Sequence, residues 1–501
     1  MSLDYMKIVD TSNILEKINE EGTLLENRRK INSRYNTDIQ ITIMVLAYNR
    51  LEKTKACIES IMKYTSNHKF KLLLVDNGSD DGTLEYFKDL QYSPKDIIRI
   101  TENKGANLGV DIAYKYFDTK YIAVVTNDII VTANWLDNFL ACLESDERIG
   151  EVNPRISNSF KYYLEQLPEI TTVEEAEEFG KQHNKSNPRL WAERVRCPSL
   201  CYMLRKEVID LIGGADIGFF HEFAEDDFQI RMRKTGYKLF LLEDTFVHHN
   251  HYMQERDLDK SNKTMIGGYQ NYIEKHHGIE PWDDMDFFVY PYIMNMQCLK
   301  QEPKILGINT RCGQPILDIE NRFRREGIEV SANNVFAFTQ EAKYYDMLRI
   351  ITQNVICDSG MDILKYYEKD SFDAIVMGED INRYEKPLEL LGGILKLLRK
   401  GGSLVLFLYN MYDFHTLFAA IMEPSWRNKN GFAQIHYNDI IEKLESEQVE
   451  YVHVMDLFHG IGEAFKNDIR KVNNILAQFE ANPDTAIEDL LTERYCFCIR
   501  K

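Results

Sequence analysis

Long apolar runs are missing from this sequence of 501 residues. No stretch approaches the roughly 18 consecutive apolar residues that a membrane-spanning helix requires. The first residues, MSLDYMKIVDTSN, also lack the basic and apolar blocks of a secretion signal. We therefore expect no transmembrane segment and a cytoplasmic protein, with a peripheral position at the inner face of the membrane as the alternative.

Basic residues are outnumbered in this chain. It has 60 Lys and Arg against 79 Asp and Glu, which gives a formal net charge of −19. A nucleic-acid-binding surface is normally a basic patch, so this balance argues against nucleic acid as a partner. It does not exclude a ligand with phosphate groups, because a bound metal ion can supply positive charge locally.

Cysteine is sparse and irregularly spaced, with nine residues in the whole chain. Cys197 and Cys201 form one close pair and Cys496 and Cys498 another, but neither has a second pair at the spacing of a zinc site. Reduced thiols in a cytoplasmic protein are the simplest interpretation.

Strands and helices are predicted to alternate between residues 40 and 150. The expected strands are apolar and rich in β-branched residues, and the segments between them carry apolar residues at helical spacing. Strands are predicted at Ile41–Ala47, Lys71–Val75, Ile97–Thr101 and Tyr121–Val125, and helices at Leu51–Tyr64, Asp81–Asp89 and Gly105–Tyr116. This alternation with short links predicts a parallel sheet with right-handed crossovers.

Each of these four strands ends in polar residues. They are Tyr48, Asn49 and Arg50 after the first strand, Asp76, Asn77 and Ser79 after the second, Glu102, Asn103 and Gly105 after the third, and Asp128 after the fourth. Parallel strands end at one edge of a sheet, and ligands of open α/β sheets bind beyond that edge. The pattern therefore predicts a nucleotide-binding crevice. The alternative for any single one of these segments is an ordinary solvent-exposed turn.

Four segments in this region resemble family 2 glycosyltransferases with the GT-A fold. They are AYNR, VDNGSDDGT, ENKGANLGVDIAYKY and VVTNDIIVTANWLD, and they follow the family's order and spacing. The resemblance implies a GT-A nucleotide-sugar-binding domain, with a Rossmann-like mixed sheet, over residues 39–278. It implies a UDP-, GDP- or dTDP-linked sugar as donor. It also implies donor contacts from Ala47, Tyr48, Asn49, Arg50, Asp76, Asn77, Asn103, Gly105, Asp111, Asn127 and Asp128.

The same resemblance implies a divalent cation, Mg²⁺ or Mn²⁺, at the donor's diphosphate. Asp128 corresponds to the last acid of the family's DxD motif, whereas Thr126 stands at the first, so this motif supplies a single carboxylate. In metal-dependent members a histidine after a later strand can complete the metal site. The run DTFVHHNH offers His248 or His249 for that position.

An acidic helix start, EFAEDDFQIR, resembles the family's ED motif and provides the catalytic candidates Glu225, Asp226 and Asp227. A sugar hydroxyl is a poor nucleophile, and a carboxylate within hydrogen-bond reach can take its proton as it attacks. Counting along the motif in two directions selects either Glu225 or Asp226 as the base. Asp227 is expected to cap the helix or to pair with Arg231. The alternative is a solvated helix start that the helix dipole favours.

Two segments flank or interrupt this domain. Residues 1–38 predict a helical N-terminal lead-in. Residues 151–196 are interpreted as an insertion that carries an acidic helix at Thr171–His183. Long insertions over an active site are often lids or acceptor platforms. An exposed surface helix is the alternative.

The rest of the chain predicts a second α/β domain at 304–501, after a connector at 279–303. Its strands are predicted at Ile305–Asn309, Gly327–Ala332, Phe372–Met377, Ser403–Leu408, Glu450–Asp456 and Arg494–Arg500, the last two as a hairpin-like pair. Helices are predicted at Pro315–Glu326 and Leu388–Leu398. The segments LLRKGGSLVLFLYN and FDAIVMGEDINRYEKP resemble class I methyltransferases that use S-adenosylmethionine. The resemblance implies a second, Rossmann-like domain of methyltransferase type.

The cofactor signature of that second family is eroded. Gly307 and Gly313, in the segment GINTRCG, do not reproduce the family's glycine spacing. Asn333 and Asn334 are interpreted as standing where an acid would bind the ribose. Close backbone approach and a ribose acceptor are what such a site needs. S-adenosylmethionine is therefore kept as a disfavoured cofactor.

Three functions are consistent with these patterns. The first is a metal-assisted, inverting glycosyltransferase that moves a sugar to a hydroxyl of a glycan or protein acceptor, in bacterial surface glycosylation. The second is a bifunctional enzyme that also methylates the sugar. The third is a non-catalytic scaffold that binds sugar nucleotides, suggested by Thr126 in the DxD motif and by the shifted ED motif.

Overall fold

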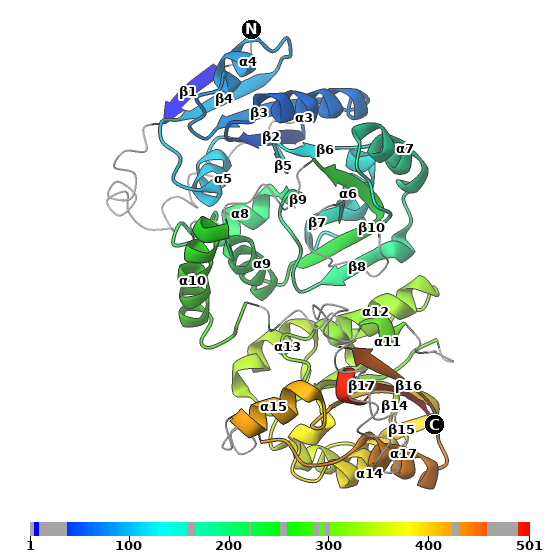
Figure 1. Cartoon of the computed structure of the whole chain (residues 1–501). Helices are drawn as coiled ribbons and strands as arrows, with labels where there is room; N and C mark the ends of the chain where they lie inside the picture. Colours follow the sequence, from blue (N-terminus) through cyan, green and yellow to red (C-terminus); the bar gives the residue numbers. More distant parts are fainter. Residues whose placement is uncertain are drawn as a thin grey trace. The chain divides into compact units, whose positions relative to one another are not determined.

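The computed structural model describes residues 5–9, 38–157, 167–219, 222–250, 258–281, 283, 290–294, 296, 301–422, 431–457 and 489–501. The chain divides into two compact units, Met1–Asp284 and Met285–Lys501 (Figure 1). This boundary falls inside the segment 279–303 that we interpret as a connector. Each unit is an α/β structure, which confirms the predicted fold class.

The N-terminal unit is built on one large mixed sheet. Its strands are β1 (Tyr5–Val9), β2 (Ile41–Ala47), β3 (Phe70–Asp76), β4 (Lys95–Ile100), β5 (Tyr121–Thr126), β6 (Ile129–Ile130), β7 (Ile149–Ile156), β8 (Trp191–Arg194), β9 (Cys201–Arg205) and β10 (Lys238–His249). The order is β1-β4-β3-β2-β5-β9-β7-β10-β6, and β8 pairs with β10. Strands β1 to β5 are parallel, while β9 is antiparallel to both of its neighbours, β5 and β7.

Helices cover both faces of this sheet. They are α3 (Leu51–Tyr64), α4 (Thr83–Asp89), α5 (Ala106–Tyr114), α6 (Trp135–Ser145), α7 (Val173–His183), α8 (Lys206–Ile212), α9 (Ala224–Lys234) and α10 (Leu258–Lys275), with a 3₁₀ turn η1 (Pro188–Leu190). In β2, Ile43 and Val45 belong to the core on the side of α3 and α6, whereas Met44 and Leu46 belong to the core on the side of α5 and α8. Burial on both faces explains why this strand is apolar throughout.

The first residues differ from the predicted helical lead-in. Residues 5–9 form β1, which lies parallel to β4 at the edge of the sheet. The main-chain hydrogen bonds that β4 offers at its open side stabilise a strand here, although the side chains of Met6 and Ile8 are exposed. The positions that carry the helical spacing, between residues 10 and 37, lie outside the described residues.

The segment 151–196 is not an insertion over its whole length. Its two ends are strands of the sheet, β7 and β8, so only residues between them can form an added segment. The prediction missed β7 because the strand contains Glu151, Asn153 and Arg155, all of which are buried. Burial of this strand is compatible with such residues because the Glu151 carboxylate accepts hydrogen bonds from Asn153 and from Gln229 of α9.

Helix α7 packs against the sheet. A capping box between Thr172 and Glu175 starts the helix. The ring of Phe179 stands edge-on to Phe246 of β10, with 4.8 Å between centroids. Just after the helix, Asn184 donates hydrogen bonds to Thr132 and to the main chain of β10. These contacts hold α7 as a structural element of the sheet's cover.

The C-terminal unit has a seven-stranded sheet. Its strands are β11 (Ile305–Ile308), β12 (Val335–Thr339), β13 (Asn354–Cys357), β14 (Phe372–Asp380), β15 (Leu398–Tyr409), β16 (Glu450–Leu457) and β17 (Thr492–Arg500). The order is β13-β12-β11-β14-β15-β17-β16, and the antiparallel pair β16/β17 confirms the predicted hairpin-like closure. The first five strands are parallel. Strands β12 and β13 follow on one side of β11 and strands β14 and β15 on the other, so the strand order reverses between β11 and β14.

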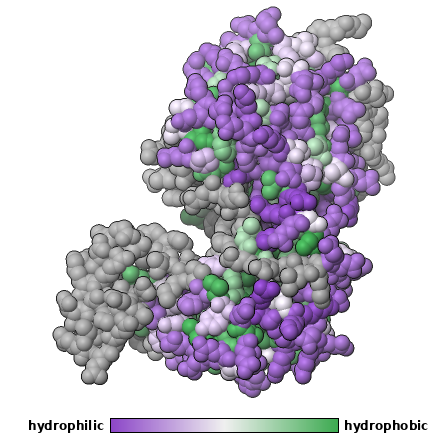
Figure 2. Space-filling view, turned by 90° about the vertical axis from the view of Figure 1, so that its right-hand side faces the viewer, coloured by the Kyte–Doolittle hydropathy of each residue, from purple (hydrophilic) through white to green (hydrophobic). Residues whose placement is uncertain are grey.

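The helices of this unit lie between its strands in sequence. They are α11 (Tyr290–Ile293), α12 (Gln314–Arg325), α13 (Tyr345–Ile351), α14 (Pro387–Leu397), α15 (Phe414–Met422) and α17 (Tyr437–Ser446), with 3₁₀ turns η3 (Ala332–Asn334), η4 (Ala342–Tyr344), η5 (Gly360–Lys365) and η6 (Ile381–Arg383). On the face in Figure 2, hydrophilic side chains cover most of the described surface, and apolar ones form separate small patches.

The second strand of this unit was predicted in the wrong place. The strand is β12, Val335–Thr339, and not Gly327–Ala332. Gly327 instead follows the end of α12, with φ of 80°, and residues 332–334 form the turn η3. Glycine at a helix end provides the left-handed conformation that stops the helix, so the sequence from Gly327 leads out of α12 and not into a strand.

Candidate functional site

Polar side chains from separate strand ends of the N-terminal unit are linked to one another. The amide of Asn127, after β5, donates to the main-chain oxygen of Asn49, after β2, at 2.9 Å. The amide of Asn77, after β3, donates to Asn103 and to the main chain of Gly105, both at 3.2 Å. The structure therefore brings together four of the segments that the sequence analysis placed at a common edge.

The turn after β2 has an unusual backbone. Asn49 and Arg50 adopt positive φ angles of 53° and 63°. Hydrogen bonds hold this turn, because Asn49 N–H donates to Ser79 Oγ at 2.9 Å and Asn49 Oδ1 accepts from Asp80 N–H at 3.0 Å. Beside it, Tyr48 is 48% exposed. An exposed aromatic ring on a fixed turn at a sheet edge is suited to stack on a planar ligand group.

Asp76 is fully buried at the end of β3, next to Ala47 of β2 in register. One carboxylate oxygen accepts from the Ser79 N–H at 2.9 Å, and the other forms an ion pair with Arg99 of β4. Arg99, which the sequence analysis did not select, also donates to the main chain of Ser79. Both oxygens of Asp76 are thus engaged by protein groups and have no exposed surface, and the hydrogen bond from a nucleobase stays a prediction.

Asp111 lies on α5 and faces a glycine turn from another part of the chain. A Cβ atom added to Gly214 would stand 1.9 Å from Asp111 Oδ1, so only glycine allows this approach. Burial raises the pKa of Asp111, and its ion pair with Lys115 at 3.3 Å counteracts that shift. Asp111 therefore borders the loop that precedes α9.

Asp128 stands two residues after β5 and is surrounded by groups that favour its charge. Thr126, at the position of the first DxD acid, donates to Asp128 Oδ1 at 2.9 Å. Arg50 Nη1 and His249 Nε2 approach Asp128 Oδ2 at 3.4 and 3.3 Å. Thr126, which stands in place of the first acid of the DxD motif, therefore donates a hydrogen bond to the last acid, Asp128.

The two adjacent histidines of β10 point in different directions, as alternate residues of a strand do. His249 approaches Asp128, whereas the ring of His248 contacts Ser157 through Nδ1 at 2.7 Å. Burial, and then the neighbouring His249, lower the pKa of His248 to about 4. Between the two open candidates, the geometry joins His249 and not His248 to Asp128.

A divalent cation can bind at this edge only if the sugar-nucleotide donor and water supply some of its ligands. Among the described residues, no group of three or more His, Cys, Asp and Glu side chains is arranged to hold a metal ion. Asp128 and His249 offer one carboxylate and one imidazole. This set suits Mg²⁺ or Mn²⁺ whose remaining ligands are phosphate oxygens and water.

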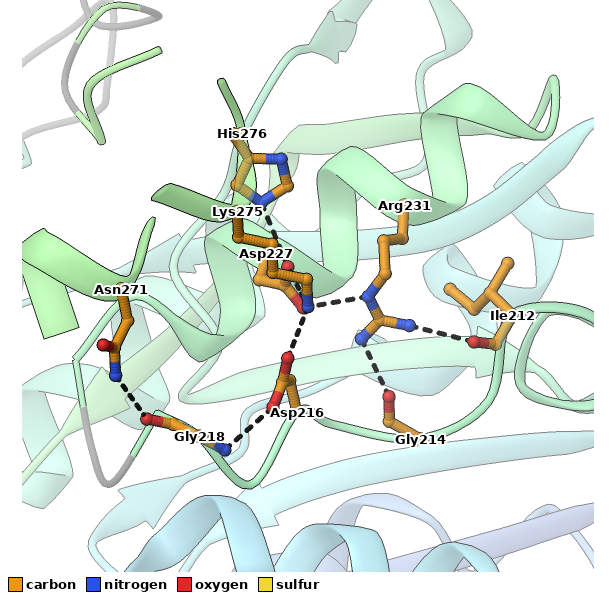
Figure 3. A network of polar contacts seen from close by, with 9 residues as sticks. All are labelled: Ile212, Gly214, Asp216, Gly218, Asp227, Arg231, Asn271, Lys275 and His276. Carbon is orange, nitrogen blue, oxygen red and sulfur yellow. Dashed lines mark hydrogen bonds and ion pairs between the residues drawn. The ribbon is translucent and has the colours of Figure 1, made fainter. Parts of the chain in front are cut away.

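The three acids at the start of α9 have three different environments. Asp227 is fully buried and contacts Arg231 at 2.8 Å, Lys275 at 2.6 Å and His276 at 3.0 Å (Figure 3). Burial by itself would raise the pKa of Asp227, but the bond to His276 and the charges of Arg231 and Lys275 bring it below its usual range. Asp227 pairs with Arg231, as predicted, and is a structural anchor.

Asp226 is held by a residue that the sequence analysis did not select. Arg196 forms a buried ion pair with it, at 2.6 Å between Nη1 and Oδ1. Burial raises the pKa of Asp226, and Arg196 counteracts that rise. Arg196 stands in a loop without any motif, so its role could not be found from spacing.

Glu225 is the remaining acid, and the described residues place no cation in ion-pair contact with its side chain. Burial, and then the charge of Asp226, raise the pKa of Glu225 to about 8. A raised pKa at a partly exposed helix start is a common property of catalytic carboxylates.

Strand β9 begins beside the end of β5, the strand that Asp128 follows. The first residues of β9 pair with the last of β5, Cys201 with Val125, and Thr126 N–H bonds to the main chain of Leu200. Burial raises the pKa of Tyr202 in this strand, and Glu225 is close enough for its charge to raise it further. The charge of Asp128 acts in the same way on Cys57, whose neighbour is Cys201.

Part of the N-terminal unit matches a known protein family. Residues 42–212 match the family model described as Glycosyl transferase family 2. The N-terminal unit contains a family 2 glycosyltransferase domain. The uncharacterized glycosyltransferase YfnE of Bacillus subtilis is 22% identical over 156 residues, which are 31% of this chain and 40% of that protein. The chain thus matches well under half of this relative's length.

Solved structures resemble the chain over part of its length and at low identity. A mannosyltransferase from Pyrobaculum calidifontis, solved with GDP-Man and Mn²⁺, is 14% identical, with a TM-score of 0.36, over 56% of this chain and 80% of its own. A SAM-dependent methyltransferase from Archaeoglobus fulgidus is 17% identical, with a TM-score of 0.31, over 46% of this chain and 99% of its own. In the described residues, none of the helices is both long and apolar enough for a membrane span.

The correct position of β12 changes one argument about the second unit. The acid expected after the second strand was sought at Asn333 and Asn334, which precede that strand. Glu341 follows its end and is half-exposed beside Lys343, at 3.5 Å. An acid that could contact a ribose is therefore present in the C-terminal unit, and the fit of a cofactor there depends on the neighbouring turn at 309–313.

Proposed function

We propose that this protein transfers a sugar from a nucleoside diphosphate donor to a hydroxyl acceptor, with inversion at the anomeric carbon. The observation that carries this proposal is the match of residues 42–212 to a family 2 glycosyltransferase, together with the different environments of Asp128 and Glu225. Asp128 has Arg50 and the ring of His249 beside it, and Glu225 has a raised pKa, so the two carboxylates are suited to different tasks.

The donor is proposed to lie across the ends of β2, β3 and β5. Tyr48 offers an exposed ring for the base, and Asp76 is proposed to accept a hydrogen bond from a ring N–H. The linked amides of Asn77, Asn103 and Asn127 fix the turns around the ribose and diphosphate. The donor is proposed to be a UDP-, GDP- or dTDP-linked sugar.

The diphosphate is proposed to bind beside Asp128, where Arg50 and His249 also point. A divalent cation held by Asp128 and His249 would offset the charge that develops on the leaving group. Arg50 adds a cation that the protein itself provides at this position.

Glu225 is proposed as the base, in preference to Asp226 and Asp227. The other two acids are engaged in buried ion pairs, with Arg196 and with Arg231 and Lys275. A carboxylate with a pKa near 8 is a stronger proton acceptor than an ordinary one and suits a hydroxyl nucleophile. Attack from the side opposite the diphosphate inverts the anomeric centre. The acceptor is proposed to be a glycan or a protein at a bacterial surface.

Release of nucleoside diphosphate tests this function. Purified full-length protein is incubated with UDP-, GDP- and dTDP-sugars, with and without Mn²⁺, and the free diphosphate is measured. We expect one donor class to be hydrolysed, and Asp128→Ala to slow the reaction at least 100-fold. Asp118→Asn, an exposed acid of the same unit, serves as the matched control. Equal slow release by wild type and Asp128→Ala would instead support the non-catalytic scaffold.

A further inference from the structure

The turn after β11 has several residues with positive φ, as a ligand-binding glycine turn does, but only one of them is glycine. Asn309, Arg311 and Gly313 alternate along this turn and have positive φ angles of 49°, 51° and 94°. Glycine is the usual residue in that conformation, and in Rossmann-like sheets its missing side chain lets a cofactor approach the backbone. Here two of the three positions carry a side chain at the point where the strand order reverses.

The side chain of Asn309 connects three strand ends. Its amide nitrogen donates to Glu379 Oε2, at the end of β14, at 3.1 Å and to the Tyr384 hydroxyl at 2.7 Å. Its amide oxygen accepts from the Gln340 N–H, just after β12, at 2.8 Å. All the hydrogen-bonding capacity on the nitrogen is thereby used by the protein's own groups.

The surrounding space is filled by protein atoms. Asn309 is 5% exposed, and Tyr384 is buried. A Cβ atom added to Gly378 would stand 2.4 Å from the main-chain oxygen of Asn309 and 2.6 Å from the Cα of Thr310. The first turn and β14 therefore touch where an open crevice would separate them. A ligand that reached this point would have to displace Asn309 and leave Glu379 and the buried Tyr384 without their shared donor.

We infer that the C-terminal unit binds no nucleoside cofactor at its strand-order switch point, and that Asn309 serves there as a structural crosslink between β11, β12 and β14. S-adenosylmethionine does not fit, although Glu341 stands where a ribose acceptor belongs. The unit therefore has the sheet of a methyltransferase and a core-like seam in place of the cofactor site. This inference is independent of the glycosyl transfer proposed for the N-terminal unit.

Measurements of two kinds, of cofactor binding and of local and global stability, test the inference on the full-length protein. Calorimetric titration with S-adenosylmethionine and with S-adenosylhomocysteine, each to about 1 mM, should give no saturable heat. Hydrogen exchange followed by mass spectrometry should show faster exchange in Asn309→Ala for peptides that contain Gln340, whose N–H loses its acceptor. The midpoint of thermal unfolding of this unit should fall by about 5 °C.

Two further variants keep the result interpretable. Asn333→Ala removes an exposed amide of the same unit and should change neither measurement. Tyr384→Phe removes only one of the two acceptors of the Asn309 amide nitrogen. It should lower the midpoint of thermal unfolding by less than about 5 °C, and it takes the place of Asn309→Ala if that variant does not fold. Saturable binding of either nucleoside would overturn the inference. So would unchanged exchange and stability in a folded Asn309→Ala variant, because a crosslink cannot be removed without consequence.

Discussion

Arg196 and Asp226 form an ion pair inside the N-terminal unit, and each side chain is only 6% exposed. This pair neutralises one of two adjacent acids and leaves its neighbour, Glu225, without a cation in contact among the described residues. A buried carboxylate beside another resists ionisation, so the pair separates the tasks of the two acids. The assignment of the base depends on this single contact more than on the motif.

Breaking this pair should destabilise the N-terminal unit. Arg196→Met leaves the buried carboxylate of Asp226 without its partner, and we expect a loss of about 3–5 kcal/mol in the free energy of unfolding. The double variant Arg196→Met with Asp226→Leu removes both charges and should recover most of that loss. Chemical denaturation of the four proteins in the cycle measures the coupling. Additive effects of the two single changes would contradict a direct pair.

Glu225 should set the pH dependence of the reaction. Because burial raises its pKa to about 8, the carboxylate is mostly protonated at pH 7, and kcat/KM should rise about tenfold per pH unit below 8 and level off above it. Glu225→Gln should lower the rate by about 100- to 10,000-fold and remove this limb of the profile. A wild-type profile that is flat between pH 6 and 9 would exclude Glu225 as the base. Glu52→Gln, at an exposed position, is the control.

Much of the first unit could be predicted because its parallel strands are buried on both faces. The run ITIMVLA predicts β2 correctly, and the polar residues after each strand meet as expected. Partners that come from loops without a pattern could not be predicted. Arg196 is an example, since no spacing connects it to Asp226. Arg99 lies in a predicted strand, but nothing in the sequence pairs it with Asp76.

The errors have physical causes as well. Strand β7 was missed because Glu151 and Asn153 are polar, and only the folded chain supplies the Gln229 amide that makes their burial acceptable. In the C-terminal unit, the left-handed turn after β11 was not predicted, because Asn309 and Arg311 occupy positions where glycine is the usual signal for positive φ. The error in β12 then removed Glu341 from consideration.

Glu151 should make the stability of the N-terminal unit depend on pH. Burial raises its pKa to about 7, against an ordinary value of 4.5, while Asn153 and Gln229 partly offset the shift. The folded state therefore retains a proton that the unfolded state has lost, so this contribution is complete below pH 4.5 and disappears as the pH rises to 7. Glu151→Gln should be more stable than wild type by about 3 kcal/mol at pH 8 and similar to it near pH 4.5. Urea denaturation at both pH values tests this.

Asp227 should be essential for the position of α10. It joins Arg231 of α9 to Lys275 and His276, and Lys275 also pairs with Asp216 (Figure 3). We expect Asp227→Asn to lower the free energy of unfolding by about 1.5–3 kcal/mol, because the part-exposed cations of Arg231 and Lys275 and the buried His276 lose a charged acceptor. Since the pKa of Asp227 is lowered, its contribution is present above the ordinary pKa of aspartate and is lost as the pH falls. Glu274→Gln on α10 is the matched control, and equal stability of both variants would refute the anchor.

The two histidines of β10 should separate in a metal titration. His249 contacts Asp128, so His249→Ala should raise the Mn²⁺ concentration for half-maximal activity at least tenfold. His248 contacts Ser157 in the interior, so His248→Ala should leave that concentration unchanged and lower the free energy of unfolding by about 1–2 kcal/mol through the lost hydrogen bond. The opposite result, with His248→Ala alone altering the metal requirement, would mean that the strand presents its other face to the donor and that His249 contacts Asp128 without binding the metal.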